Sequence, residues 1–260
     1  MKPELIECLN QINREFYSTF AESFSKTRPE SARELERILP YIADGASVLD
    51  VGCGNGRVAA FLALHRRDVT YIGMDASAEQ ISNSKSQFLK GLDATFSLAD
   101  ITQPDWTHAL PLSKAGDPLA LHFREALHEP SIGIFDCVLM LAVLHHIPGG
   151  EVRVRIMRQV RKLLAPRGRV VISTWQFLDN ERMRKKIVPW STVEGIDEQE
   201  LEPGDALLNW KRDGVGLRYC HWIGEDELRS LAAKANLKIA DTFRVGGREG
   251  DLSLYAILFA

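Results

Sequence analysis

Residues 48–56 read Val48-Leu49-Asp50-Val51-Gly52-Cys53-Gly54-Asn55-Gly56, and no other stretch says more about the architecture of this chain. Apolar residues interrupted by a single Asp are typical of a buried strand, and three glycines at alternate positions follow. Residues 57–64 then have the apolar pattern of a helix. Glycines let the backbone turn sharply and approach a ligand where a Cβ would clash. Strand, glycine turn and helix together indicate the opening unit of a nucleotide-binding α/β fold.

The spacing of these glycines argues against a dinucleotide site. The pattern is G-x-G-x-G, whereas dinucleotide folds use G-x-G-x-x-G and bind a pyrophosphate at the helix N-terminus. Asp50, near the end of the strand, would repel a pyrophosphate and suits a ligand with a cationic end. An NAD(P)-dependent oxidoreductase is therefore disfavoured.

Two further acidic residues stand at the ends of predicted strands. The strand at 70–75 ends in Asp75, about 20 residues after the glycine turn, where nucleotide folds bind ribose hydroxyls. The strand at 94–99 is followed by Asp100. Either acid alone could form a turn or cap a helix. Acids at three successive strand ends indicate one shared ligand site.

With these residues the chain resembles the class I S-adenosylmethionine (SAM) methyltransferases. Residues 50–56 resemble their motif I, Asp75 their ribose-binding acid and Asp100 their acid at the adenine edge. The resemblance implies a Rossmann-like α/β fold: a mainly parallel seven-stranded sheet with a C-terminal antiparallel hairpin and helices on both faces. It implies SAM as cofactor and S-adenosylhomocysteine as product. The cofactor-binding residues that it implies are Asp50, Gly52, Cys53, Gly54, Asn55, Gly56, Asp75, Ala76, Asp100, Ile101 and Leu141.

The rest of the chain alternates between strand and helix patterns, which supports a parallel sheet independently of the motif. We predict a single domain over 1–260, with leading helices in 1–44, a SAM-binding half in 45–134 and a substrate half in 135–260 that carries an insertion at about 176–222. The predicted strands are 48–51, 70–75, 94–99, 135–141, 169–175, 237–244 and 252–259. The predicted helices are 4–24, 31–39, 57–64, 77–89, 119–127, 150–164 and 225–235.

Composition narrows the function classes. The chain has 260 residues, of which 45% are hydrophobic, enough for one sizeable core. A net charge of −3 argues against binding polyanions by bulk charge. The four cysteines are far apart and form no C-x-x-C pair, which predicts a reducing compartment and no metal site. No apolar run is long enough for a membrane span or a signal peptide, so we expect a cytoplasmic protein.

Three features of the substrate half indicate an acceptor site. His145 and His146 form an adjacent pair where a predicted strand ends, and Trp175 ends the next strand. Residues 204–210 and 217–222 pack aromatic, His and Arg residues densely into the insertion. Ligands of open α/β sheets lie at the carboxyl ends of the strands, where these groups converge. A backbone-bonding His and a core Trp remain the alternative interpretation of these residues.

A basic block at 153–186 makes the chain electrically polarised. Within it only Asp179 and Glu181 are acidic. Phosphate contacts with a polyanion such as tRNA are the functional interpretation, and a solvated helix face is the alternative. The basic residues are Arg153, Arg155, Arg158, Arg161, Lys162, Arg167, Arg169, Arg182, Arg184, Lys185 and Lys186.

These segments together resemble one methyltransferase branch, the tRNA wobble-uridine enzymes that methyl-esterify 5-carboxymethyluridine. The resemblance includes residues 16–28, 142–146 and 204–221. It implies tRNA modification, in which a carboxylate acceptor needs no general base but needs cations or hydrogen-bond donors to orient it. In relatives of this branch a small activator subunit is required, so such a partner is possible. The acceptor-side residues that we expect are Arg28, His145, His146, Trp175, Asp205, Arg218 and Tyr219, with His221 a further donor.

Within this expectation Arg28 and one His hold the carboxymethyl group, Trp175 or Tyr219 stacks on the base, and Asp205 binds a polar edge of the nucleotide. Two alternatives stay open. The same cofactor half could serve a methyltransferase that acts on a small-molecule carboxylate, hydroxyl or amine. The chain could also be a non-catalytic SAM-binding scaffold, although its intact acids and glycines argue against a decayed site.

Overall fold

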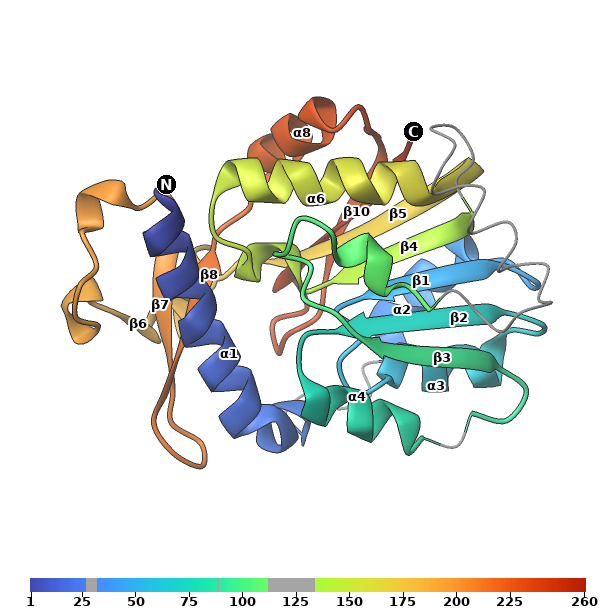
Figure 1. Cartoon of the computed structure of the whole chain (residues 1–260), viewed down its shortest axis with the longest axis horizontal. Coiled ribbons are helices and arrows are strands. Elements are labelled where there is room, and N and C mark those ends of the chain that lie inside the picture. Colours follow the sequence, from blue (N-terminus) through green and yellow to red (C-terminus); the bar gives the residue numbers. More distant parts are fainter. Residues whose placement is uncertain (27–31, 88, 112–133) are drawn as a thin grey trace.

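A computed structural model describes residues 1–26, 32–87, 89–111 and 134–260, and it confirms the expected α/β architecture (Figure 1). The strands of the large sheet are β1 (Ser47–Val51), β2 (Thr70–Asp75), β3 (Asp93–Leu98), β4 (Phe135–Leu141), β5 (Leu164–Trp175), β9 (Lys238–Val245) and β10 (Ser253–Phe259). Their order is β3-β2-β1-β4-β5-β10-β9. All pairs among β1 to β5 are parallel, and β10 is antiparallel to both of its neighbours.

Helices cover both faces of this sheet. They are α1 (Pro3–Lys26), α2 (Ala32–Ile38), α3 (Arg57–His65), α4 (Ala78–Lys85), α6 (Gly150–Leu163), α7 (Glu181–Arg184) and α8 (Glu225–Lys234). Short 3-10 helices are η1 (Leu39–Tyr41), η2 (Trp106–Ala109), η3 (Leu144–His146), η4 (Trp190–Thr192) and η5 (Glu198–Glu200). The helix predicted at 119–127 lies outside the described residues.

The core forms two layers because successive side chains of a strand point to opposite faces. In β4, Val138 and Met140 pack with α6 and α8, whereas Cys137 and Leu139 pack with α2 and α3. All four side chains are fully buried. Burial on both faces explains why this strand is a continuous apolar run instead of an alternating one.

The connection between α6 and β5 differs from the prediction. The helix ends at Leu163, but β5 begins at Leu164 instead of Arg169. Leu164 pairs with Phe135, and the register then shifts before the pairing of Cys137 with Arg169. The residues expected to form a simple turn therefore stay against the edge of β4, because Leu164 finds a backbone partner immediately after the helix.

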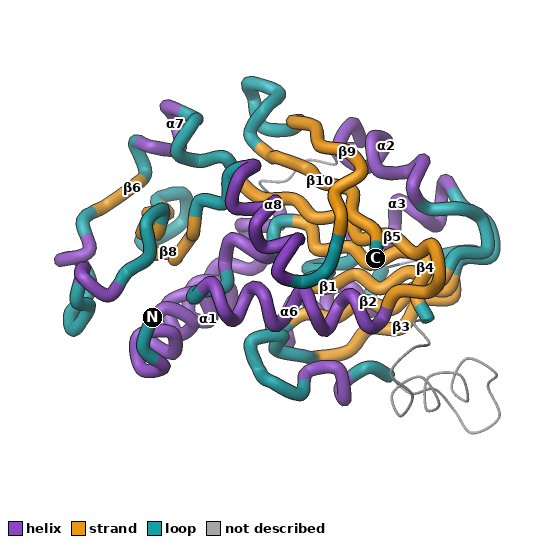
Figure 2. Tube along the Cα trace, turned by 90° about the horizontal axis from the view of Figure 1, so that it is seen from above, coloured by secondary structure: helices purple, strands orange, loops and turns teal. Residues whose placement is uncertain are grey.

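The insertion folds into a second sheet. Its strands, β6 (Ile187–Val188), β7 (Asp205–Trp210) and β8 (Gly216–His221), are antiparallel. Helix α1 lies between this sheet and the large one (Figure 1). Leu5 and Leu9 of α1 pack with Tyr219, and Phe16 and Phe20 pack with Trp210. Seen from above, β6 and β8 lie at one end of the molecule and α3 at the other (Figure 2).

None of the helices in the described part of the chain is long and apolar enough to cross a membrane. Cys8, Cys53, Cys137 and Cys220 are all free thiols, and the last three are buried. Buried thiols of this kind pack as small apolar groups.

Candidate cofactor and acceptor site

A cavity of about 430 Å³ opens at the carboxyl ends of β1 to β4 and is walled by α1. The loop after β1 contributes Gly52 and Gly54, and the loop after β2 contributes residues 75–80. Residues 99–102 follow β3, and residues 141–143, 146 and 147 follow β4. Four parallel strands therefore deliver their ends to one site, as open α/β sheets do for nucleotide ligands.

The first glycine of the motif is required by geometry. Gly52 has φ +77°, and a Cβ on it would lie 2.3 Å from Cγ2 of Val143. The amide of Gly52 donates to the carbonyl of Met74 at 2.7 Å, which ties the turn to β2. Only a residue without a side chain fits between β2 and the loop after β4.

Asp75 organises the cavity from the end of β2. Its Oδ2 accepts the amide of Gly54 at 2.9 Å, and its Oδ1 accepts the amide of Ser77 at 2.9 Å. An ionised carboxylate offers about four lone-pair sites, so ribose hydroxyls can bind the same group. The prediction for Asp75 agrees with this position on the cavity wall.

Asp100 occupies the corresponding place after β3. Thr102 donates to its Oδ1 twice, from the amide at 2.9 Å and from the hydroxyl at 2.6 Å. Both bonds use one oxygen of the carboxylate, and Asp100 lines the same cavity. Ala76, Ile101 and Leu141 line the cavity as well.

Asp50 does not line the cavity, so its place as a direct cofactor contact needs correction. Its side chain is 1% exposed and lies on the face of β1 that also carries Val48, toward α2 and α3. The hydroxyl of Tyr71 donates to it at 2.5 Å. Burial raises the pKa of Asp50 to about 6, against the opposing effects of the Tyr71 bond and of Arg57. Asp50 therefore holds β1 to β2 through Tyr71, on the face of the sheet that carries α2 and α3.

Three other motif residues also stay outside the lining. The thiol of Cys53 is buried against its own turn, and Asn55 uses its carbonyl to accept the side chain of Gln87. Gly56 is the N-cap of α3 with φ +81°. These residues shape the turn, and the ligand-facing part of the motif is limited to Gly52 and Gly54.

The histidine pair divides between wall and core. His146 lines the cavity, whereas His145 is fully buried and its ring lies 4.8 Å from that of Trp175. Nδ1 of His146 lies 3.1 Å from the carbonyl of Tyr219, and its Nε2 lies 2.9 Å from the hydroxyl of Tyr17. A carbonyl only accepts, so Nδ1 carries the proton, and in the neutral ring Nε2 accepts from Tyr17.

Arg218 is not a cavity residue, contrary to the sequence-based expectation. It is 2% exposed, and its guanidinium lies 4.7 Å from the ring of Phe16, 5.1 Å from that of Trp175 and 5.6 Å from that of Trp210. Cation–π contacts of this kind stabilise a desolvated guanidinium. Trp175 thus lies behind the histidine pair, and its face is used by Arg218.

Tyr219 and Asp205 belong to a buried polar cluster and do not contact the cavity. The hydroxyl of Tyr219 donates to Oδ1 of Asp205 at 2.6 Å, and Tyr219 is fully buried. Burial and the charge of Asp205 raise the pKa of Tyr219 well above its usual value, so the phenol keeps its proton. Neither residue can stack on a base or bind a nucleotide edge in this arrangement.

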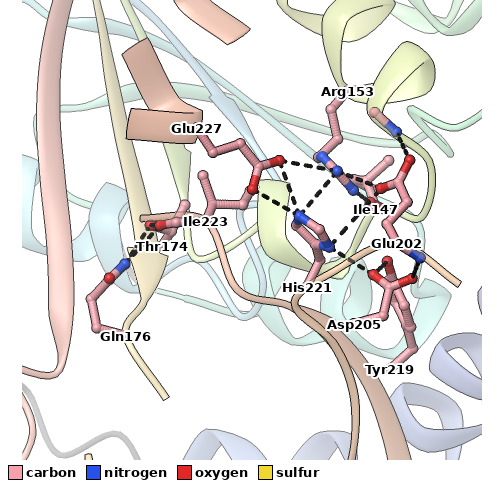
Figure 3. Close-up of polar contacts among 11 residues, drawn as sticks. Ile147, Arg153, Thr174, Gln176, Glu202, Asp205, Tyr219, His221, Ile223 and Glu227 are labelled. Carbon is pink, nitrogen blue, oxygen red and sulfur yellow. Dashed lines mark hydrogen bonds and ion pairs between the residues drawn. The ribbon is translucent and has the colours of Figure 1, made fainter. Parts of the chain in front are cut away.

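The cluster continues through His221 to α6 and α8 (Figure 3). Arg153, 2% exposed, donates to Glu202 at 2.7 Å and to Glu227 at 3.1 Å. One ligand atom each of Glu202, Asp205 and His221 lies within 4.8 Å of the others, a spacing that a metal ion could use. The guanidinium of Arg153 is paired with Glu202 and Glu227, so these residues form an ion-pair network.

The basic block is not gathered on one surface. Arg153 is buried among carboxylates, and Arg155, Arg158 and Arg161 donate to the backbone carbonyls of Thr102, Lys234 and Asn236. Arg155, Arg158 and Arg161 therefore attach α6 to neighbouring parts of the chain. Residues 182–186 follow the carboxyl end of β5, whereas Arg169 lies near its amino end, about 20 Å from Trp175 along the extended part of the strand. Arg28 lies outside the described residues.

Sequence reasoning included the leading helix in the resemblance but did not identify the side chains of α1 that line the cavity. Asn10, Asn13, Arg14 and Tyr17 share one face of this helix at i, i+3, i+4 and i+7 spacing, and all four line the cavity. The side chain of Asn13 donates to the carbonyl of His146 at 3.0 Å. The polar stripe opposite the Leu and Phe positions was the available signal.

Comparison with known proteins agrees with this geometry. The family described as "Methyltransferase domain" matches residues 24–242. "Putative methyltransferase ECU09_1500" from Encephalitozoon cuniculi is 28% identical over 94% of this chain and 92% of its own length. Mouse "tRNA (carboxymethyluridine(34)-5-O)-methyltransferase ALKBH8" is 25% identical over 82% of this chain, which spans only 28% of that protein.

Two further similarities are to a curated enzyme and to a solved structure. "Trans-aconitate 2-methyltransferase" from Azoarcus sp. is 26% identical over 78% of this chain and 81% of its own length. A solved methyltransferase, in complex with the Haloferax volcanii Trm112 methyltransferase activator, superposes with a TM-score of 0.60. It is 14% identical and covers 95% of this chain and 96% of its own, so this likeness concerns the fold.

Proposed function

The chain belongs to the methyltransferase domain family, and from this premise we propose that it methylates the carboxylate of 5-carboxymethyluridine at the wobble position of tRNA. Its activity as a SAM-dependent methyltransferase follows from the family. The acceptor is the proposed part, and the curated relative that names this acceptor is similar across 82% of the chain.

The chemistry of an ester-forming methyl transfer is compatible with the cavity. SAM supplies a methyl group on a positively charged sulfur, which keeps the electron pair of the broken bond. A carboxylate acceptor has an unperturbed pKa near 4 and is already ionised at neutral pH. It needs orientation toward the methyl group and exclusion of water, and it needs no proton removed.

The observation that carries the proposal is the position of His146 on the cavity wall. Its ring and the hydroxyl of Tyr17 form one hydrogen-bonded pair at the end of β4, beside Ala142 and Val143. The hydrogen-bonded pair of Tyr17 and His146 offers the Tyr17 hydroxyl, which can turn from Nε2 of His146 toward the acceptor and is a donor of the type that orients a carboxylate oxygen. The carboxylates of Asp75 and Asp100, which we assign to the cofactor, belong to residues that line the same cavity at the ends of β2 and β3.

We assign one part of this cavity to SAM and another to the acceptor, according to the strand that supplies each wall. Asp75 would accept the ribose hydroxyls and Asp100 the adenine amino group, while the loop of Gly52 and Gly54 approaches the amino-acid part of SAM. His146 and Tyr17 would then face the acceptor. The carboxylate would bind near them, with its reacting oxygen in line with the sulfur and the methyl carbon.

A small-molecule acceptor is the second candidate, and the similarity to trans-aconitate 2-methyltransferase favours it. Trans-aconitate also presents carboxylates, so the same donors at His146 and Tyr17 would serve. The dispersed basic block removes one argument for tRNA without affecting the carboxylate. The two candidates therefore differ in acceptor size and share the reacting group.

A labelling experiment separates them. The purified chain is incubated with SAM labelled in its methyl group and with total tRNA or a panel of small polycarboxylates. The tRNA is then digested and its nucleosides are separated. We expect label in a base-labile methyl ester of a modified uridine. Label only in a small carboxylate would establish the second candidate.

The assay needs an arm with an activator protein, because a methyltransferase of this fold is bound to the Trm112 activator. We propose that a small partner of this type is required for transfer to tRNA. Label that appears only when such a protein is co-expressed would support this requirement. Equal labelling by the chain alone would exclude it.

A further inference from the structure

The buried cluster behind the cavity wall joins three parts of the molecule (Figure 3). Asp205 and His221 come from the small sheet, Glu227 from α8 and Arg153 from α6. Glu202 precedes β7 and also accepts the amide of Gly150, the first residue of α6, at 2.7 Å. The cluster therefore holds the small sheet to the helices of the large one.

The hydrogen bonds fix the proton on each group. Oδ1 of Asp205 accepts the phenol of Tyr219, and its Oδ2 accepts the amide of Glu202 at 2.8 Å. Nδ1 of His221 lies 2.6 Å from Oδ1 of Asp205 as a third contact. Two N–H or O–H donors and a ring nitrogen surround this carboxyl group, an arrangement that suits a carboxylate because a carboxylate only accepts.

The other nitrogen of His221 also faces a carboxylate. Nε2 lies 3.0 Å from Oε1 and 2.9 Å from Oε2 of Glu227. A ring with an ionised acceptor at each nitrogen must carry a proton on both, which makes His221 an imidazolium. The Nη2 of Arg153 lies 3.1 Å from the same Nε2, and Oε1 of Glu227 contacts both nitrogens.

The charges in the cluster support this assignment. Glu202, Asp205 and Glu227 bring three negative charges, and Arg153 brings one positive charge. Burial lowers the pKa of His221, but the hydrogen bonds to Asp205 and Glu227 outweigh it and raise the pKa above its usual value. Burial alone would raise the pKa of Glu227, and its bond to His221 turns the net shift downward.

The same cluster is bonded to the wall of the cavity at two adjacent residues. The carbonyl of Tyr219, whose phenol binds Asp205, accepts Nδ1 of His146 at 3.1 Å. Arg153 donates through Nη1 to the carbonyl of Ile147 at 2.9 Å. His146 and Ile147 both line the cavity. The position of both residues and the tautomer of His146 therefore depend on the cluster.

We propose that His221, held as an imidazolium between Asp205 and Glu227, is a positioning residue that locks His146 in place on the acceptor side of the cavity. It acts through Asp205 and Tyr219 and touches no ligand. Because the charged ring is what joins the two carboxylates, the lock weakens as pH rises through the pKa of His221 in the folded protein. Glu202, whose carboxylate lies 4.0 Å from Nδ1, adds to the field that retains the proton.

The sign of the pH effect follows from linkage. A histidine whose pKa is raised on folding binds a proton that the unfolded chain has already released at intermediate pH. Its contribution to stability is complete below the unfolded pKa, near 6.5, and is lost as pH rises through the folded value. The groups that face it are Asp205, Glu202, Glu227 and Arg153, and loss of its proton removes the positive charge that joins Asp205 to Glu227.

The first test needs no variant. The protein is labelled with ¹⁵N-histidine and long-range ¹H–¹⁵N spectra are recorded at pH 7.5. We expect both ring nitrogens of His221 to be protonated, and the exposed His108 serves as an internal reference. His146 should show a proton on Nδ1 alone. A neutral His221 at this pH would overturn the proposal.

The second test uses His221→Gln with His108→Gln as the matched control. The variant should lose thermal stability relative to wild type at pH 6, and the difference should shrink as pH rises. The ¹⁵N signals of His146 should move in His221→Gln and stay unchanged in the control. Unchanged His146 signals would remove the positioning role. Stoichiometric binding of added Zn²⁺ with loss of the His221 proton would replace the lock by a metal site.

The last arm rests on the proposed function. In the methyl-transfer assay, His221→Gln should raise KM for the acceptor several-fold at pH 7.5 and leave the affinity for S-adenosylhomocysteine unchanged. A loss of cofactor affinity of equal size would indicate a general collapse of the site and overturn the proposal. If no acceptor is methylated by wild type, the proposed function fails, while the spectra still decide the state of His221.

Discussion

The loops at the ends of β1 to β4 and the insertion at 176–222 are the two polar regions of this molecule, and they use their polar groups in opposite ways. In the loops, Asp75 and Asp100 hold backbone amides and line the cavity. In the insertion, Asp205, Arg218 and His221 point inward and bind one another, aromatic rings or helices. Both regions looked equally functional in the sequence.

The difference comes from what each region has to attach. A parallel strand is anchored on both sides by its neighbours, so the loop that follows it is available for a ligand. A three-stranded sheet has little core of its own and needs contacts with the rest of the protein. Its buried polar groups supply those contacts, and they must be satisfied because they are removed from water. Density of polar residues therefore does not identify a ligand site.

Arg153→Met gives the sharpest contrast between the two regions. It leaves Glu202 without its cation and Glu227 with His221 alone, and breaking a buried ion pair costs roughly 3–5 kcal/mol of stability. Denaturant unfolding should show this loss, while the folded fraction should bind S-adenosylhomocysteine normally. The control Arg229→Ala removes an exposed i,i+4 pair with Glu225 and should cost about 0–1 kcal/mol. Equal effects of the two variants would contradict the structural role of the cluster.

Asp75→Ala tests the opposite region. Loss of charge-assisted hydrogen bonds should weaken binding of SAM and S-adenosylhomocysteine by about 1.5–3 kcal/mol, measured by calorimetry. Stability should change less than in Arg153→Met, since Asp75 lies on the cavity wall. Asp93→Ala, at the exposed start of β3, is the control. Unchanged affinity would remove Asp75 from the cofactor site.

Asp50→Asn tests a motif residue that is buried outside the cavity, in contrast to Asp75 on the cavity wall. With a pKa of about 6 against 3.8 unfolded, Asp50 keeps a proton in the folded protein that the unfolded chain has released. Stability contributed by that proton is present at low pH and is lost as pH rises between about 4 and 6. The variant has no such loss, so its stability relative to wild type should rise across this interval. The change is on the order of 2–3 kcal/mol, because the pKa rises from 3.8 to about 6 on folding and each pKa unit corresponds to about 1.4 kcal/mol.

Thermal unfolding of both proteins at several pH values measures this difference. A parallel pH dependence of the two would show that Asp50 does not titrate there. Binding of S-adenosylhomocysteine should change little, in contrast to Asp75→Ala, because Asp50 does not line the cavity.

The smallest expected effects concern tRNA affinity, and they differ between the two ends of the basic block. Arg161→Ala should leave affinity for tRNA unchanged, because Arg161 attaches α6 to Asn236. Arg184→Ala combined with Lys185→Ala should weaken binding modestly and reduce its salt dependence, since these residues follow the carboxyl end of β5. Filter binding at several salt concentrations provides the measurement. A stronger effect of Arg161→Ala would restore a continuous basic surface.

The cofactor half could be predicted in detail because its signals are local. The turn at Gly52 and the strand-end acids Asp75 and Asp100 follow from motif and spacing, and the mainly parallel seven-stranded sheet follows from the family resemblance that they carry. Seven of the expected cofactor residues line the cavity. Of the four exceptions, Cys53, Asn55 and Gly56 shape the turn, and the position of Asp50 follows from strand geometry. Asp50 lies one position before the end of β1, where period-two alternation turns its side chain to the α2 and α3 face.

The acceptor half was predicted less well because its contacts join residues far apart in the chain. His146 meets Tyr17 across 129 residues, and Tyr219 meets Asn13 across 206. No local pattern distinguishes His146 from His145, since adjacent residues of a 3-10 turn differ only in what packs beside them. The direction of Arg218 was decided by the aromatic rings of α1 and β5, which no spacing within β8 reveals.

By itself, the sequence determined the family, the cofactor and the sheet, because period-two burial and a glycine turn are properties of neighbouring residues. Only the tertiary structure decided which polar groups face the cavity. The free energy of a buried His, Arg or Asp depends on the partners that other elements bring to it, and those partners exist only once α1, α6, α8 and the small sheet have packed together.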